Sequence, residues 1–169
     1  MSHSSSKPSR TARCTFCGLE PRTCPHLGPD CAPSREHSHG NDDVTVVAAV
    51  VERDGRLLLC RRPAHKRHGG LWEFPGGKVL PDETLGEALQ RELAEELQLE
   101  LESIGEQVGR HRDPGSPFVI YFVEVSAAGE PISLEHEQIE WVAPRELDRV
   151  DLAPSDRSFV RSWRKLGRS

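Results

Sequence analysis

The segment Gly77–Leu99 constrains the fold of this chain more than any other part of it, because it predicts a helix with a defined start and a defined buried face. Thr84 and Glu87 have the Ser/Thr-x-x-Glu spacing of a capping box, in which each side chain satisfies a free backbone N–H group at the helix start. Leucines recur at every fourth position and form one apolar face: Leu85, Leu89, Leu93 and Leu97. We therefore expect a helix over Thr84–Leu97 that packs on a core through this face.

A second face of the same helix carries acids. Glu92, Glu95 and Glu96 are three and four residues apart, so their carboxylates lie within about a turn of one another. Partial burial and mutual repulsion disfavour the ionised acids unless a hard divalent cation neutralises them. The spacing therefore predicts a site for Mg²⁺, with Mn²⁺ as a substitute, and the alternative is a solvated helix face.

Together with the glycine turn before the helix, these residues resemble the signature of the Nudix hydrolases. The defining positions that match are Gly77, Glu83, Arg91, Glu92, Leu93, Glu95, Glu96 and Leu99. The one departure is Gln98, where the family has a glycine that lets the chain leave the helix in a left-handed conformation. That glycine contributes no ligand, so the departure concerns the helix exit and not the chemistry.

Residues outside the signature resemble the MutT-type branch of this family, which hydrolyses nucleoside triphosphates. The resemblance covers residues 44–166 and includes Leu71–Val79, Glu135 and Trp141. It implies an α/β fold, a Nudix-type α/β/α sandwich with a mixed β-sheet. It also implies Mg²⁺-dependent hydrolysis of a nucleoside triphosphate to a nucleoside monophosphate and pyrophosphate.

The resemblance also assigns roles to individual residues. The expected metal ligands are the Gly76 carbonyl, Glu92, Glu95, Glu96 and Glu135. The expected catalytic group comprises Glu92 or Glu135 as the general base, with Glu83 and Arg91 as supporting residues. The expected substrate-binding residues are Arg62, Phe74 and Lys78. Glu135 has the alternative of an ordinary surface acid, and Phe74 has the alternative of a core residue.

The identity of the base is the most open part of this interpretation. Enzymes of the branch that act on oxidised guanine, such as 8-oxo-dGTP, have an asparagine where this chain has Ser155 or Asp156. This departure argues against an enzyme specific for 8-oxo-dGTP, and a (d)CTP-type pyrophosphohydrolase is a rival because such enzymes have a similar Trp-Glu-Phe-Pro-Gly-Gly segment, here residues 72–77. A non-catalytic Nudix-like module that binds nucleotides is a rival of another class, although every acid of the signature is present.

Periodicity outlines the rest of the fold. Apolar, β-branched runs predict strands over Val44–Val51, Arg56–Arg62, Phe118–Val125 and Ile139–Val142. Glu100–Arg112 predicts a strand with a bend, Leu71–Gly77 an irregular turn and Pro154–Leu166 a final helix. Pro63–Gly70 is a basic loop before the signature, and it could supply the positive charge that a phosphate substrate needs.

Residues 1–43 differ from the remainder, because they are rich in Ser, Pro, His, Gly and Cys and lack aliphatic periodicity. We expect them to form a poorly ordered, Cys-rich extension before a domain over residues 44–169. Cys14, Cys17, Cys24 and Cys31 have a spacing that suits a structural Zn²⁺ site, and a tail with incidental thiols fits equally well. A further alternative gives this extension the main role, as a zinc-dependent contact to a protein or nucleic acid.

The chain has 169 residues and a net charge of −5, which fits one domain with a sizeable core. Its apolar runs are too short to span a membrane, and residues 1–13 lack the apolar region of a secretory signal. We expect a cytoplasmic protein that binds a nucleotide, with no membrane contact and no direct nucleic-acid partner. The sequence does not indicate the oligomeric state.

Overall fold

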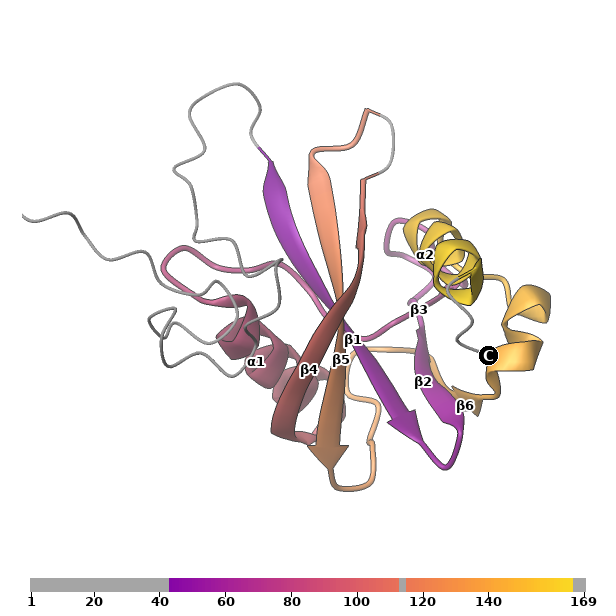
Figure 1. Ribbon diagram of the computed structural model, residues 1–169, viewed down its shortest axis with the longest axis horizontal. Helices are drawn as coiled ribbons and strands as arrows, with labels where there is room; N and C mark the ends of the chain where they lie inside the picture. The colour runs from indigo at the N-terminus through magenta and orange to yellow at the C-terminus, as the bar shows by residue number, and fades with distance from the viewer. Residues whose placement is uncertain (1–42, 113–114, 166–169) are drawn as a thin grey trace, which may run out of the picture.

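A mixed β-sheet lies at the centre of the molecule, with helices on both of its faces (Figure 1). The computed structural model describes residues 43–112 and 115–165. Its strands are β1 (Val44–Arg53), β2 (Arg56–Arg61), β3 (Trp72–Glu73), β4 (Glu100–His111), β5 (Phe118–Ala128) and β6 (Gln138–Val142). Its helices are α1 (Leu85–Leu97), the 3₁₀ helix η1 (Pro144–Arg149) and α2 (Pro154–Lys165).

The strand order is β3-β2-β1-β5-β4, and β6 pairs with β2. β1 runs parallel to β5, whereas the other paired strands are antiparallel. β1 and β2 are joined by a tight hairpin, in which Asp54 and Gly55 adopt positive φ angles of 52° and 69°. The expectation of a mixed sheet between helices is confirmed.

β1 contributes to two hydrophobic cores, since successive residues of a strand point to opposite faces of the sheet. Val47, Ala49 and Val51 pack with the leucines of α1. Ala48 and Val50 pack on the other face with apolar residues of α2. Burial on both faces explains why the sequence of β1 is almost continuously apolar rather than alternating.

Helix α1 begins and ends as the sequence predicts. Thr84 is its N-cap, and both hydrogen bonds of the capping box with Glu87 are formed. At the other end Gln98 adopts φ 54° and ψ 30°, the left-handed conformation that glycine provides in the family signature. The N–H groups of Gln98 and Leu99 donate to the carbonyls of Ala94 and Leu93, respectively, at 3.1 Å. The helix exit is therefore preserved despite the departure from the signature.

The segment before α1 runs along β1 and approaches it closely. The N–H groups of Val47 and Ala49 donate to the carbonyls of Gly77 and Pro75 at 2.9 and 2.8 Å. Gly76 has φ 145°, and a Cβ atom there would overlap the carbonyl oxygen of Val47. Only glycine fits this position, because any side chain would push the segment away from the strand.

One prediction of local structure is wrong in part. Leu71–Gly77 is predicted to contain an irregular turn, and residues 74–77 do lie outside any helix or strand, but Trp72 and Glu73 pair with Arg61 and Cys60 as the short strand β3. The sequence hides this strand because it is only two residues long and Pro75 follows it after a single residue. Cys60 itself is fully buried in the core beside α1.

The extension over residues 1–43 lies almost wholly outside the described residues, and Cys14, Cys17, Cys24 and Cys31 are all outside them. The structural Zn²⁺ site therefore stays a prediction, as does the boundary between extension and domain. Over residues 43–112 and 115–165, no helix has both the length and the apolar character needed to cross a membrane.

The left-handed residue at the end of α1 generates a prediction on stability. Because Gln98 is exposed, its replacement removes little buried surface, and glycine adopts the same conformation at lower cost. We expect Gln98→Gly to raise the free energy of unfolding by about 0.5–1 kcal/mol, as measured by urea denaturation. Gln98→Ala keeps the Cβ atom and serves as the control, so an equal gain from both variants would contradict this explanation.

Candidate active site

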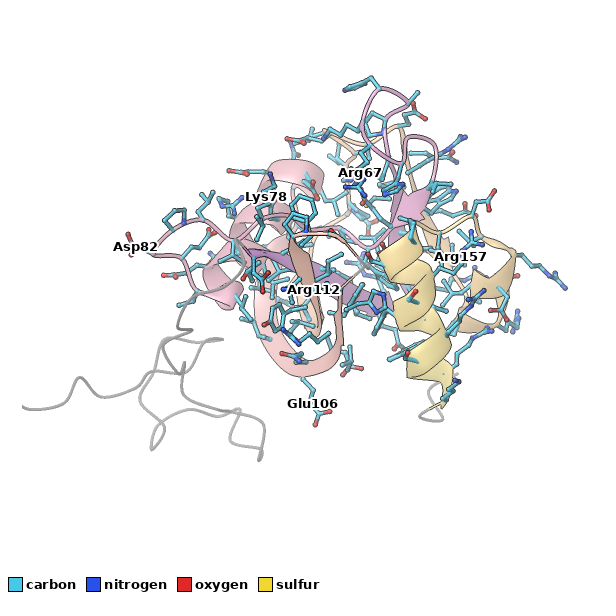
Figure 2. The ribbon with its side chains drawn as sticks, turned by 90° about the horizontal axis from the view of Figure 1, so that it is seen from above. Arg67, Lys78, Asp82, Glu106, Arg112 and Arg157 are labelled. Atoms are coloured by element: carbon cyan, nitrogen blue, oxygen red, sulfur yellow. The ribbon has the colours of Figure 1, made fainter. Side chains whose placement is uncertain are left out.

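A cavity of about 490 Å³ opens where the segment before α1, the acid face of α1 and the start of α2 meet. Acids and cations both line it: Glu73, Glu92, Glu96 and Asp156, and Arg62, Lys66, Arg67 and Lys78. Figure 2 labels Arg67, from the loop between β2 and β3, and Lys78, from the segment before α1. Elements far apart in the sequence thus enclose one charged cavity.

Arg91 organises the outer part of the acid face. Its guanidinium binds both carboxylate oxygens of Glu83, at 2.8 and 2.9 Å, and it donates to Glu92 at 2.8 Å and to Glu95 at 3.3 Å. The hydrogen bonds from Arg91 lower the pKa of Glu83, and those to Glu83 raise the pKa of Arg91. A fifth hydrogen bond to the carbonyl of Lys78 ties this network to the segment before the helix.

Glu96 is the most deeply buried acid of the helix face, with a side chain that is 10% exposed. Its Oε2 accepts a hydrogen bond of 3.1 Å from the N–H group of Gly76. Burial, together with the charges of Glu92 and Glu73, raises the pKa of Glu96 to about 7, although the charge of His136 and the Gly76 hydrogen bond oppose the shift. This carboxylate therefore lies where a negative charge is poorly compensated.

These residues fit a hard divalent cation by the chemistry of their donors. Glu92, Glu95 and Glu96 offer carboxylate oxygens, which Mg²⁺ prefers. The carbonyls of Pro75 and Gly77 accept hydrogen bonds from β1. No described residue donates a hydrogen bond to the Gly76 carbonyl, which lies between them in the sequence. In the described part of the chain, no group of His, Cys, Asp or Glu side chains forms a metal site as it stands. The carboxylates of Glu92 and Glu95 accept hydrogen bonds from Arg91.

The predicted site residues divide into two groups by position. The cavity wall includes Arg62, Phe74, Gly76, Lys78, Glu92 and Glu96. The other predicted residues, Glu83, Arg91, Glu95 and Glu135, do not line it. Glu95 and Glu135 have exposed side chains, at 58% and 51%, and Glu135 pairs with Lys66 at 3.2 Å.

The residues predicted to bind substrate differ in how accessible they are. The ring of Phe74 is buried and packs edge-on against Phe122 and Phe159, an arrangement that favours a core role over stacking on a base. Arg62 forms an ion pair with Glu73 in the cavity. Lys78 lies over the ring of Phe118, 5.5 Å from its centroid, and no described carboxylate pairs with it.

Asp156 lies at the end of the cavity formed by α2. It accepts a hydrogen bond of 2.9 Å from the N–H group of Phe74. Burial raises its pKa to about 7, and the Phe74 hydrogen bond and the charge of Arg62 act in the opposite direction. Of the two residues that the sequence offered for base recognition, Asp156 is thus a buried carboxyl group held by a backbone hydrogen bond.

Glu73 and His136 were missed as site residues. Glu73 lies between Trp72 and Phe74, and this alternation could have indicated that its side chain points away from theirs. His136 follows Glu135 in a polar loop, and nothing in its neighbours indicates burial, yet its side chain is only 4% exposed. Both residues line the cavity.

The raised pKa of Glu96 generates a prediction on stability. Glu96 binds its proton more tightly in the folded protein than in the unfolded chain, so the folded state loses stability as the pH rises from about 4.5 to about 7. Glu96→Gln removes this penalty and should raise the free energy of unfolding at pH 8 by on the order of 2 kcal/mol in metal-free buffer. Urea denaturation in EDTA at pH 8 and pH 4 measures the difference.

The gain should be small at pH 4, where the carboxyl group is protonated in both states. Glu87→Gln is a matched control on the same helix, because the capping box accepts either residue. A gain of equal size at both pH values would show that packing, rather than the buried charge, sets the stability at this position.

Comparison with known proteins places this geometry in a family. A model of the NUDIX domain matches residues 42–163. CTP pyrophosphohydrolase of Escherichia coli (strain K12) is 40% identical over 126 residues, which cover 73% of this chain and 93% of that protein. The Mycobacterium tuberculosis (strain ATCC 25618 / H37Rv) protein named "Putative 8-oxo-dGTP diphosphatase 2" is 37% identical over 118 residues, which cover 68% of this chain and 84% of that protein.

Solved structures agree with the sequence relatives. The solution structure of the E. coli ORF135 protein matches with a TM-score of 0.64 and 40% identity, over 75% of this chain and 91% of that chain. Other relatives and solved structures carry MutT in their names. The chain therefore belongs to the Nudix hydrolase family, in its MutT-like branch.

Proposed function

We propose that this Nudix hydrolase converts a nucleoside triphosphate to a nucleoside monophosphate and pyrophosphate with the help of Mg²⁺. The observation that carries the proposal is the position of Glu92 and Glu96 in one cavity with the cations Arg67 and Lys78. Acids for a divalent ion and cations for phosphates are both needed, because the substrate carries several negative charges. The names of the relatives support the same class of substrate.

The metal would be held by Glu92, Glu95, Glu96 and the Gly76 carbonyl, with Glu135 as a further ligand once its exposed side chain turns away from Lys66. When bound, Mg²⁺ would neutralise phosphate charge and lower the pKa of an attacking water. Arg91 would hold the carboxylates of Glu92 and Glu95 in position through its hydrogen bonds to them. Glu83 would in turn fix the guanidinium of Arg91.

Among the acids, we favour Glu92 as the general base. Its side chain is 13% exposed and lines the cavity, and Arg91 holds only its Oε1 atom. The other oxygen would accept the proton of water as the bond between the α- and β-phosphates is hydrolysed. Glu135 remains the alternative base, although its pairing with Lys66 would first have to open.

For the base of the nucleotide, we propose cytosine, with 8-oxoguanine as the second candidate. Asp156 offers a buried carboxyl group beside the Arg62–Glu73 pair. A carboxylate accepts a hydrogen bond from the exocyclic amino group of cytosine. The CTP pyrophosphohydrolase of E. coli supports this choice, whereas the M. tuberculosis relative supports the second candidate.

The ligand role of the helix acids is tested by removing their charge. Glu95→Gln and Glu96→Gln should each lower kcat by at least about 100-fold, because each removes a charged ligand and keeps the shape of the side chain. Pyrophosphate release from a nucleoside triphosphate in excess Mg²⁺ measures the rate. Glu87→Gln, the same substitution on the same helix, should keep the wild-type rate. A wild-type rate in either ligand variant would refute its assignment.

The choice of base is tested at Asp156. Asp156→Asn keeps an oxygen for the Phe74 N–H group but adds an amide donor where the carboxylate would accept. We expect the ratio of kcat/KM for CTP to that for 8-oxo-dGTP to fall by about tenfold or more. A panel of canonical and oxidised triphosphates should be measured with both proteins. An unchanged ratio would remove Asp156 from base recognition.

A further inference from the structure

The loop between β5 and β6 is fixed to the metal-binding helix by its backbone. The N–H groups of Ile132 and Leu134 donate to the carbonyls of Leu97 and Glu96, both at 2.9 Å. The hydroxyl of Ser133 donates to the carbonyl of His136 at 2.8 Å, which closes the loop on itself. The position of His136 relative to α1 is therefore set by several hydrogen bonds.

The imidazole of His136 lies close to two carboxylates from different elements. Its Nε2 atom is 3.6 Å from Oε1 of Glu73, on β3, and 3.9 Å from Oε1 of Glu96, on α1. Both acids are largely buried, with side chains that are 18% and 10% exposed. One ring nitrogen thus lies close to two largely buried acids of like charge.

The second oxygen of each acid is already engaged elsewhere. Oε2 of Glu73 pairs with Arg62, and Oε2 of Glu96 accepts from the N–H group of Gly76. The Oε1 atom of each acid is therefore the one that lies near Nε2 of His136. Across the described residues, the other ring nitrogen, Nδ1, is buried and has no hydrogen-bond partner. Nε2 is therefore the atom through which this side chain can act.

We propose that His136 is a positioning residue that aligns Glu96 with Glu73, and so couples the metal-binding end of the cavity to its substrate-binding end. This inference rests on the proposed function, because it takes Glu96 as a ligand and Arg62 as a substrate contact. The distances from Nε2 of His136 to the two carboxylates are longer than a hydrogen bond. Hydrogen bonds at catalytic sites are often long in ligand-free structures and shorten when substrate is bound. The Nε2–H group would then donate to the two carboxylates.

Without this donor, the two Oε1 atoms would repel each other across a buried space. Glu96 would turn from the direction set by Gly76, and Glu73 would shift its pair with Arg62. Residues that orient metal ligands commonly change metal affinity or activity by about 10–100-fold when they are replaced. The loss should fall on metal binding and kcat rather than on KM.

A pair of substitutions separates positioning from packing. The amide nitrogen of Gln in His136→Gln can reach the place of Nε2, whereas that of Asn in His136→Asn reaches only the place of Nδ1. We expect His136→Asn to weaken Mn²⁺ binding about tenfold, as measured by electron paramagnetic resonance without nucleotide, and to lower kcat with Mg²⁺ by a similar factor. His136→Gln should remain within about threefold of the wild-type protein in both measurements.

Controls make the result specific. Melting temperatures of the two variants should be similar, and Glu130→Gln, an exposed acid at the start of the same loop, should leave Mn²⁺ binding and kcat unchanged. Wild-type values in His136→Asn would overturn the proposal. Equal losses in both variants, together with lowered melting temperatures, would also overturn it in favour of packing. Failure of the wild-type protein to hydrolyse any triphosphate would reject the proposed function, while the Mn²⁺ comparison would still decide the role of His136.

Discussion

The close contact between β1 and the segment before α1 is the constraint on which the rest of the site depends. The hydrogen bonds from Val47 and Ala49 draw that segment onto the strand, and Gly76 is required because no side chain fits against the Val47 carbonyl. The carboxylate of Glu92 lies against the backbone of Gly77, and a Cβ atom at Gly77 would overlap that carboxylate. The turn therefore brings backbone groups next to the acids of α1, and a bulkier residue would separate them.

The acids of the candidate site are compensated unevenly, and this unevenness supports the proposed position of a cation. Arg91 partly compensates the outer acids through hydrogen bonds to Glu83, Glu92 and Glu95. Glu96 receives one backbone hydrogen bond and has His136 beside it, so burial keeps its pKa high. A buried acid that is compensated so little lowers the stability of the fold, a cost that is common at functional sites.

Much of this arrangement could be predicted from the sequence, because it is local. The capping box at Thr84, the apolar face of α1 and the acid face all follow from spacing within one helix. His136 and Glu73 could not be found in this way, since their proximity depends on a loop tied to α1 and on a strand of two residues. Phe74 is a related case, because its sequence neighbours suit either a core or a binding role and only tertiary packing distinguishes them.

Cys60 is buried in the core beside α1, where desolvation and the charges of Glu96 and Glu73 raise the pKa of its thiol. A thiol that stays protonated is a poor ligand for soft metals, although sulfur would ordinarily attract them. The domain thus places a cysteine near its acids without offering a thiolate. The buried thiol of Cys60 is therefore a poor nucleophile and a poor metal ligand as long as the domain stays folded.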